Sequence, residues 1–284
     1  MSESMDIFKP ELLAGKTVFV TGGASGIGLG IVDRFAAAGA NLVIASRRQE
    51  KCEIVAKDLR KKYGIKTLGL GLDVRESAKV NEAFKKAHTE MGGPHILINN
   101  AAGNFYWPAE KMRDKLWHAV INIDLNGTFY CSRAAFKYMK EAGEGCIIST
   151  TMTLHKNGWP GMAHATAAKA GIDALTQTLA LEWARYNIRV NAVAPGPILT
   201  EGVAEAFKAG GNFEEFIQTI PLGRQGKVEE IGNMMVFLAS PAATWITGAI
   251  FTVDGGEGLS PRRASITPER LEKLIAARKE NRGS

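Results

Sequence analysis

The sequence has few cysteines and no long uncharged apolar run. Its 284 residues include three cysteines, Cys52, Cys131 and Cys146, which are widely spaced and have no histidine at ligand spacing. Such a set predicts reduced thiols, with neither a disulfide framework nor a metal site. No stretch approaches the roughly 20 apolar residues of a membrane span, and the first residues contain acids and no apolar signal region. We therefore expect a cytoplasmic protein with no membrane partner.

Charge of either sign is present in ordinary amounts, so composition excludes little else. Lys and Arg number 35 against 29 Asp and Glu, a net charge of +6, and 45% of the residues are hydrophobic. That apolar fraction is enough for a large core. The positive excess suits a polyanionic ligand such as a dinucleotide or coenzyme A, but an ordinary solvated surface carries similar charge. We expect no nucleic-acid partner.

Short apolar runs rich in β-branched residues alternate with longer stretches of helical period. The runs are almost wholly apolar, which is typical of parallel strands covered by helices on both faces. The predicted fold class is α/β, a doubly wound Rossmann-type domain with a parallel sheet. The expected strands are Thr17–Thr21, Asn41–Ser46, Thr67–Leu72, His95–Asn99, Cys146–Thr150, Ile188–Ala194 and Ala249–Val253. The expected helices are Ile27–Ala38, Glu50–Tyr63, Glu76–Met91, Leu125–Glu141, Ala163–Tyr186 and Val228–Ala239.

No repeat, low-complexity tract or linker divides the chain, so we predict one domain over residues 1–260. The last segment, 261–284, is basic, and Thr267 before Pro268 is a good helix start with a short apolar stripe after it. A helical extension of the same domain that packs on the body or on another subunit is one interpretation. A frayed charged tail is the other.

A glycine-rich loop, TGGASGIG at 21–28, follows the first expected strand and leads into a helix. Glycines permit a tight turn and a close backbone approach, and the helix N-terminus offers N–H groups to a pyrophosphate. Because the loop lies between a strand and a helix in the first βα unit, it predicts a dinucleotide site, with a purely structural turn as the alternative. The residues assigned to this site are Gly22, Ala24, Ser25, Gly26, Ile27 and Gly28.

The second expected strand ends without an acid. NAD enzymes usually carry a carboxylate there for the ribose hydroxyls, whereas this chain has Arg47 and Arg48. Two guanidiniums favour a 2′-phosphate and therefore NADPH, unless they are only surface residues at a helix start. Asp73 and Val74, after the third expected strand, are placed to meet the adenine.

Further motifs are NNAAG at 99–103, VNAVAPGPI at 190–198, TVDGG at 252–256 and a lysine, Lys169, at a helix start. Together with the glycine loop they resemble the short-chain dehydrogenase/reductase superfamily over nearly the whole chain. The resemblance implies a sheet of seven strands in the order 3-2-1-4-5-6-7, and a homotetramer. It also assigns further residues to the cofactor site, namely Asn100, Ala101, Lys169, Pro195, Gly196 and Ile198.

The chain departs from that superfamily at its usual catalytic set. Members ordinarily have a Tyr four residues before the Lys, which lowers the pKa of that Tyr so that it can pass a proton to a carbonyl oxygen. Here that position is Ala165, the usual serine is Met152, and the usual asparagine is Asp124. The spacing of bacterial enoyl-carrier-protein reductases fails as well, because Met162 stands at their Tyr position. Ordinary carbonyl–alcohol chemistry is therefore disfavoured.

One branch of the superfamily, the 2,4-dienoyl-CoA reductases, dispenses with this Tyr and is similar to this chain at AAGNF (101–105), NGTF (126–129), AKA (168–170) and PGPI (195–198). The resemblance implies NADPH-dependent reduction of a 2,4-dienoyl-CoA to an enoyl-CoA in the degradation of unsaturated fatty acids. Leu154 occupies the place of a different Tyr that holds the thioester oxygen in the mitochondrial form, so that role does not carry over.

Reduction of a conjugated thioester by hydride places negative charge on the thioester oxygen, so the site must stabilise an oxyanion. Loss of one hydrogen-bond donor to such an oxyanion commonly raises the activation free energy by about 3–4 kcal/mol. Asn104 is the candidate donor, and Lys169 would bind the nicotinamide ribose and supply positive charge. Asp124 could pair with Lys169, position a water for protonation on carbon, or be a structural helix acid.

Three residues are assigned to the substrate. Phe105 would wall the acyl pocket, His164 would share the proton work, and Arg75 matches an arginine that meets coenzyme A in these enzymes. Two other readings stay open. In one, the protein reduces another activated alkene or a ketone with Tyr106 as the acid, and in the other it binds NADPH without turnover.

Overall fold

The computed structural model describes residues 8–153, 158–200, 217–218 and 220–259. Within them, seven parallel strands form one sheet in the order β3-β2-β1-β4-β5-β6-β7, which confirms the predicted topology. The strands are β1 (Thr17–Thr21), β2 (Asn41–Ser46), β3 (Thr67–Gly71), β4 (Ile96–Asn99), β5 (Gly145–Thr150), β6 (Ile188–Pro195) and β7 (Ile250–Val253). Leu154 and the basic extension 261–284 lie outside the described residues.

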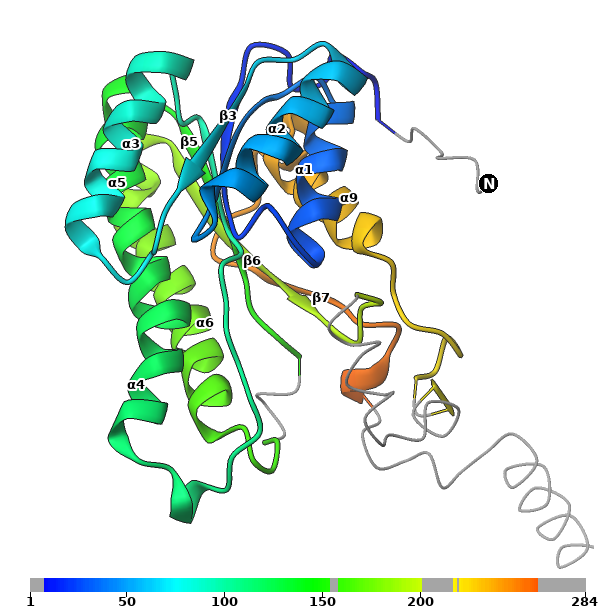
Figure 1. The fold of residues 1–284 in the computed structure, drawn as a ribbon. Helices are drawn as coiled ribbons and strands as arrows, with labels where there is room; N and C mark the ends of the chain where they lie inside the picture. The colour runs from blue at the N-terminus through cyan, green and yellow to red at the C-terminus, as the bar shows by residue number, and fades with distance from the viewer. Residues whose placement is uncertain (1–7, 154–157, 201–216, 219, 260–284) are drawn as a thin grey trace, which may run out of the picture.

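Helices cover both faces of the sheet, so the molecule has three layers (Figure 1). One face carries α1 (Ile27–Ala37), α2 (Gln49–Tyr63) and α9 (Val228–Ala239). The other carries α3 (Ser77–Met91), α5 (Gly127–Ala142) and α6 (Ala163–Trp183). The shorter α4 (Asp114–Ile121) lies alongside α6 beyond the sheet. No helix in these described ranges is long and apolar enough to cross a membrane.

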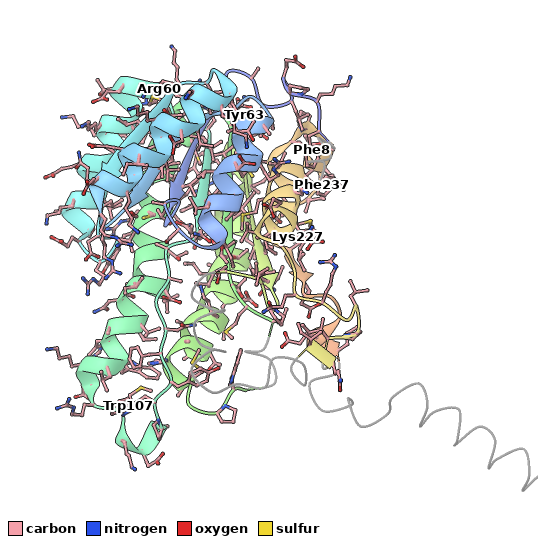
Figure 2. All side chains as sticks on the ribbon, turned by 45° about the vertical axis from the view of Figure 1, so that its right-hand side comes forward. Phe8, Arg60, Tyr63, Trp107, Lys227 and Phe237 are labelled. Atoms are coloured by element: carbon pink, nitrogen blue, oxygen red, sulfur yellow. The ribbon has the colours of Figure 1, made fainter. Side chains whose placement is uncertain are left out.

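The strands bury side chains on both faces because successive residues point to opposite sides. Along β1, Val18 and Val20 belong to the core under α1 and α9, whereas Phe19 belongs to the core under α3 and α5. All three are fully buried. Phe8 and Phe237 pack against the first of these cores (Figure 2). This two-sided burial explains why the strands read as continuous apolar runs.

The region before the fifth helix differs from the prediction. A helix was expected from Leu125 onward, but the structure has α4, then a π-helical turn η2 (Asn122–Asn126), then α5. A π turn adds a residue to the helical repeat, so the apolar stripe does not stay in phase across it. For that reason periodicity alone missed α4. The turn contains Asp124, which is buried.

The strand order places the ends of β1 and β4 at the centre of the sheet. The chain runs outward to β3 on one side of β1 and outward to β7 on the other side. In such sheets the crevice beyond the carboxyl ends of the strands, where the order reverses, is the usual ligand site. The glycine loop follows β1, and the NNAAG segment begins at the end of β4.

Candidate active site

A cleft of about 950 Å³ opens at this edge of the sheet, and most of the predicted site residues line it. Those that line it are Gly22, Ser25, Gly26, Ile27, Arg47, Asp73, Val74, Asn100, Ala101, Asn104, Asp124, Lys169, Pro195, Gly196 and Ile198. Six predicted residues are absent from the lining, namely Ala24, Gly28, Arg48, Arg75, Phe105 and His164. Sequence motifs far apart in the chain therefore meet in one cavity.

The glycine loop leaves no room for side chains at two of its positions. An ideal Cβ on Gly28 would lie 2.0 Å from the carbonyl oxygen of Gly22. One on Gly22, whose φ is +67°, would lie 2.9 Å from the Cα of Ala101. The loop thus packs its own backbone tightly, and Ile27, the first residue of α1, lines the cleft. This cradle fits the pyrophosphate of a dinucleotide.

Hydrogen bonds fix the loop to the end of β4. The Thr21 hydroxyl oxygen accepts the N–H groups of Asn100 and Ala101 at 3.0 and 3.1 Å. The Asn100 amide donates back to the carbonyl oxygens of Thr21 and Gly22 at 3.3 and 3.2 Å. The two segments expected to meet the cofactor therefore form one rigid unit.

Lys169 and Asp124 form a buried pair at the cleft. The Lys169 ammonium donates to the Thr150 carbonyl oxygen at 2.9 Å and lies 3.4 Å from Asp124 Oδ2. The other oxygen of Asp124, Oδ1, accepts the N–H of Gly103 at 2.9 Å. The structure shows one of the roles weighed for Asp124, the ion pair with Lys169. The pair orients the ammonium and the backbone that leads to Asn104.

No tyrosine occupies the usual catalytic place. Ala165 and Met152, which stand at the Tyr and Ser positions of the superfamily, both line the cleft beside Lys169. Their methyl and thioether groups have no proton to give. The carbonyl chemistry of ordinary members therefore lacks its acid at this point.

The arginines after β2 and β3 face different ways. Arg47 lines the cleft, whereas its neighbour Arg48 does not. Arg75 is engaged with Asp73, since its Nε donates to both carboxylate oxygens at 2.9 and 3.0 Å. That contact is the main reason why the pKa of Asp73 is lowered. Of these three arginines, only Arg47 is therefore in a position to meet a phosphate from within the cleft.

His164 and Phe105 lie behind the cleft wall. Their rings make an edge-to-face contact with centroids 4.6 Å apart, and His164 is fully buried. The His164 Nδ1 accepts the N–H of Ala165 at 2.7 Å, and burial lowers the pKa of the ring. Both residues support the wall from behind in this structure, and their role toward a substrate stays a prediction.

Tyr106 lines the cleft but does not have the setting of a catalytic phenol. Its side chain is 64% exposed and makes an edge-to-face contact with Trp159 at 6.2 Å. The next residue, Trp107 (Figure 2), fixes the loop, because its backbone N–H donates to the Gly161 carbonyl oxygen at 2.8 Å. Partial burial raises the pKa of Tyr106. In the superfamily, by contrast, a cation lowers the pKa of the working Tyr.

The cleft also contains an acid to which the sequence analysis assigned no role. Glu257, at the start of η6 (Glu257–Leu259), lines it and is only 6% exposed. Burial, together with the nearby charge of Asp254, raises the pKa of Glu257 to about 7. The only sequence signal was an acid directly after the two glycines that follow β7, and such a pattern does not reveal burial.

Replacing Glu257 by Gln should stabilise the protein at pH 8 but not at pH 4. The pKa of Glu257 rises from an ordinary 4.5 to about 7 on folding, so the folded chain holds the proton more tightly. In the wild type, protonated Glu257 makes its full contribution to stability below pH 4.5. This contribution is lost as the pH rises to 7, and the loss amounts to about 2–3 kcal/mol. Thermal melts across this range measure the effect. Glu229→Gln, on the exposed side of α9, should leave the pH dependence unchanged.

A family model described as enoyl-(acyl carrier protein) reductase matches residues 22–257. A solved short-chain dehydrogenase from Bacillus anthracis is 44% identical, with a TM-score of 0.77, over 86% of this chain and 96% of that one. The chain belongs to the short-chain dehydrogenase/reductase superfamily. A second solved member, a gluconate 5-dehydrogenase from Burkholderia cenocepacia in complex with NADP and tartrate, is 32% identical, with a TM-score of 0.83, over 88% of this chain and 98% of that one.

Relatives within this superfamily are named 2,4-dienoyl-CoA reductases. A Bacillus subtilis protein named a probable 2,4-dienoyl-CoA reductase, (2E)-enoyl-CoA-producing, is 40% identical over 87% of this chain and 98% of its own. The peroxisomal 2,4-dienoyl-CoA reductase of Pongo abelii, (3E)-enoyl-CoA-producing, is 40% identical over 89% of this chain and 87% of its own. These relatives confirm the predicted branch. This short-chain reductase is therefore an oxidoreductase that uses a nicotinamide cofactor.

Proposed function

We propose that this protein reduces 2,4-dienoyl-CoA thioesters to enoyl-CoA with NADPH, in the degradation of unsaturated fatty acids. The observation that carries the proposal is the combination in one cleft of Lys169 and Asn104 with Ala165 and Met152. The lysine and amide suit an oxyanion, and the loss of Tyr and Ser disfavours a carbonyl substrate. Relatives that are 40% identical over most of the chain carry the same activity in their names.

When bound, NADPH supplies the hydride for the far end of the conjugated system. The chain's own part is to bind and to stabilise charge. The Lys169 ammonium, held by Thr150 and Asp124, is a fixed positive charge in the cleft that would contact the ribose and act on the thioester oxygen. Asn104 provides an amide donor from the loop after β4. Neutral or cationic donors in fixed positions are sufficient for an oxyanion, which explains how this chemistry works without the phenol.

The direct test supplies pure protein with NADPH and a 2,4-dienoyl-CoA. The absorbance of NADPH and that of the conjugated thioester should fall together in equal amounts. A 2-enoyl-CoA and a ketone serve as control substrates, because the alternative reductase activity would act on them instead. Saturable NADPH binding without turnover of any acyl-CoA would show a catalytically inactive binding protein and overturn the proposal.

Replacing Arg47 by Ala should raise the KM for NADPH about 10- to 100-fold and leave the KM for NADH almost unchanged. A hydrogen bond to a charged group contributes about 1.5–3 kcal/mol, and only NADPH carries the 2′-phosphate. Arg48→Ala is the matched control, because Arg48 is absent from the cleft lining and should matter little. An equal effect of the two changes would contradict the assignment of Arg47.

The remaining features of the proposal follow from the superfamily. We expect a homotetramer located in the cytoplasm, and an acyl-CoA whose coenzyme end approaches the cleft near Arg75. Light scattering of the pure protein tests the subunit count, and competition by free coenzyme A tests the recognition of that end of the substrate.

A further inference from the structure

The cleft has an apolar wall between the loop after β4 and the start of α6. Four residues line the cleft there, Tyr106, Trp159, Met162 and Ala165. Met162 and Ala165 are buried in one cluster with Val120 of α4. Trp159 packs against this cluster, and its ring makes an edge-to-face contact with that of Tyr106. Side chains from separate segments therefore form one continuous apolar surface.

This wall begins beside the lysine of the cleft. Ala165 and Lys169 both line the cavity and lie one helical turn apart, so they share a face of α6. Met162, directly before the first residue of the same helix, lies about two turns from Lys169, or about 10 Å along the axis. The wall therefore leads away from the ammonium that would act on the thioester oxygen.

Two positions that carry a phenol elsewhere in the superfamily belong to this wall. Ala165 stands where most members have a Tyr, and Met162 where the bacterial enoyl-carrier-protein reductases have theirs. A phenol at either place would present a hydroxyl group to the cleft. Here the two positions carry a methyl group and a thioether. The changes that remove the acid thus also produce a surface that suits a hydrocarbon chain.

Tyr106 and Trp159, the aromatic rim, form the outer part of the wall. Exposure increases from 1% at Ala165 and 3% at Met162 to 64% at Tyr106, and Trp159 is half-buried. Large rings that are exposed at a ligand cleft gain free energy when an apolar group covers them. The aromatic rim is therefore uncovered apolar surface that continues the site at Lys169.

Contacts between two loops hold the aromatic rim in place. Besides the backbone bond from Trp107 to Gly161, the Trp107 indole donates to the Lys111 carbonyl oxygen at 2.8 Å. Gly161, whose φ is +77°, lies so close to the Tyr106 ring that an ideal Cβ would be 3.4 Å from its Cδ1. Rings that are ordered before a ligand arrives lose little conformational entropy on binding.

We propose that the aromatic rim binds the acyl tail of the substrate, so that the enzyme prefers 2,4-dienoyl-CoA thioesters with long tails to those with short ones. This inference rests on the proposed function, because the wall starts beside Lys169. The occupant is the part of the chain beyond the conjugated carbons, which is hydrocarbon and needs no polar partner. The end of the cleft at Arg47 and the glycine loop is assigned to the cofactor.

Two substrates that differ only in the tail test the preference. 2,4-Decadienoyl-CoA carries four more methylene groups than 2,4-hexadienoyl-CoA. A fully buried methylene favours binding about fourfold, so partial burial of four should raise kcat/KM about 10- to 100-fold for the longer substrate.

Tyr106→Ala tests the aromatic rim with little risk to the fold, because this side chain is largely exposed. We expect kcat/KM for the decadienoyl substrate to fall about 10-fold, while the value for the hexadienoyl substrate stays within about twofold. Trp159→Ala should give the same pattern. Tyr106→Phe keeps the ring and should change neither value. Trp107→Phe is the matched control, because this neighbouring ring is absent from the cleft lining and the variant keeps the backbone bond.

A binding measurement detects the same contact without turnover. Decanoyl-CoA has no carbon–carbon double bond to reduce. With NADP⁺ present, calorimetry should show that it binds at least about 10-fold more tightly than acetyl-CoA. Tyr106→Ala should lose most of this difference.

The outcomes separate the two claims. A wild type that reduces neither dienoyl substrate overturns the proposed function, whereas tight decanoyl-CoA binding that depends on Tyr106 would still support the aromatic rim as the acyl site. A wild type that reduces both substrates with kcat/KM values within about threefold overturns the aromatic rim alone. Equal losses for both substrates in Tyr106→Ala, or no loss for either, have the same meaning, because rings that meet the coenzyme end or a protein partner would not distinguish the tails.

Discussion

Replacing Lys169 by Met should lower kcat/KM about 1,000-fold and also destabilise the fold. The variant loses the ammonium that donates to Thr150, and with it the fixed positive charge of the cleft. Fixed charges of this kind account for about 100- to 1,000-fold each in enzymes that stabilise oxyanions, and the expected loss of the ribose contact adds to this. The Asp124 carboxylate, only 1% exposed, is left without its cation. Breaking a buried pair in this way costs about 3–5 kcal/mol.

The double variant Lys169→Met/Asp124→Asn separates the two effects. It removes the orphaned charge, while the Asn oxygen can still accept the N–H of Gly103. We therefore expect thermal stability to return while activity stays lost. Lys85→Met, on the exposed side of α3, is the control and should change neither quantity. Near-normal turnover by Lys169→Met would contradict the assignment of this lysine, whatever the melting temperature.

Replacing Gly28 by Ala should weaken NADPH binding about 10- to 100-fold or prevent folding. The new methyl group would lie 2.0 Å from the Gly22 carbonyl oxygen, which is backbone and cannot rotate away as a side chain could. Overpacking costs typically about 1–3 kcal/mol and here has to be relieved by shifting the cofactor loop itself. NADPH fluorescence titration and a thermal melt measure the two consequences.

Gly171→Ala is the matched control for the glycine loop. An ideal Cβ on Gly171 meets only the tip of the Leu125 side chain, at 3.0 and 3.1 Å, and this tip can rotate. The substitution also favours the helix α6. We expect normal NADPH affinity and equal or higher stability. Wild-type affinity in Gly28→Ala would contradict the tight loop geometry at that position.

The strands, the glycine loop and the missing tyrosine are properties of the sequence alone. Apolar runs such as Thr17–Thr21 identify strands, because the spacing of apolar residues along a short segment reflects which of its side chains are buried. The glycine loop is a local motif of the same kind. Ala165 can be recognised from its spacing to Lys169 without any coordinates. The alternation of strands and helices predicted the fold class, whereas the sheet order and the reductase branch followed from the resemblance of the motifs to a known superfamily.

Contacts between distant segments were decided only by the tertiary structure. Arg47 and Arg48 are adjacent residues of one type in the sequence, yet of the two only Arg47 lines the cleft. The pairing of Asp124 with Lys169 joins residues 45 positions apart through a π turn that periodicity did not predict. Glu257 is an ordinary acid until its segment packs beside Thr153. Burial and charge then change its chemistry, and both depend on which chain segments meet in space.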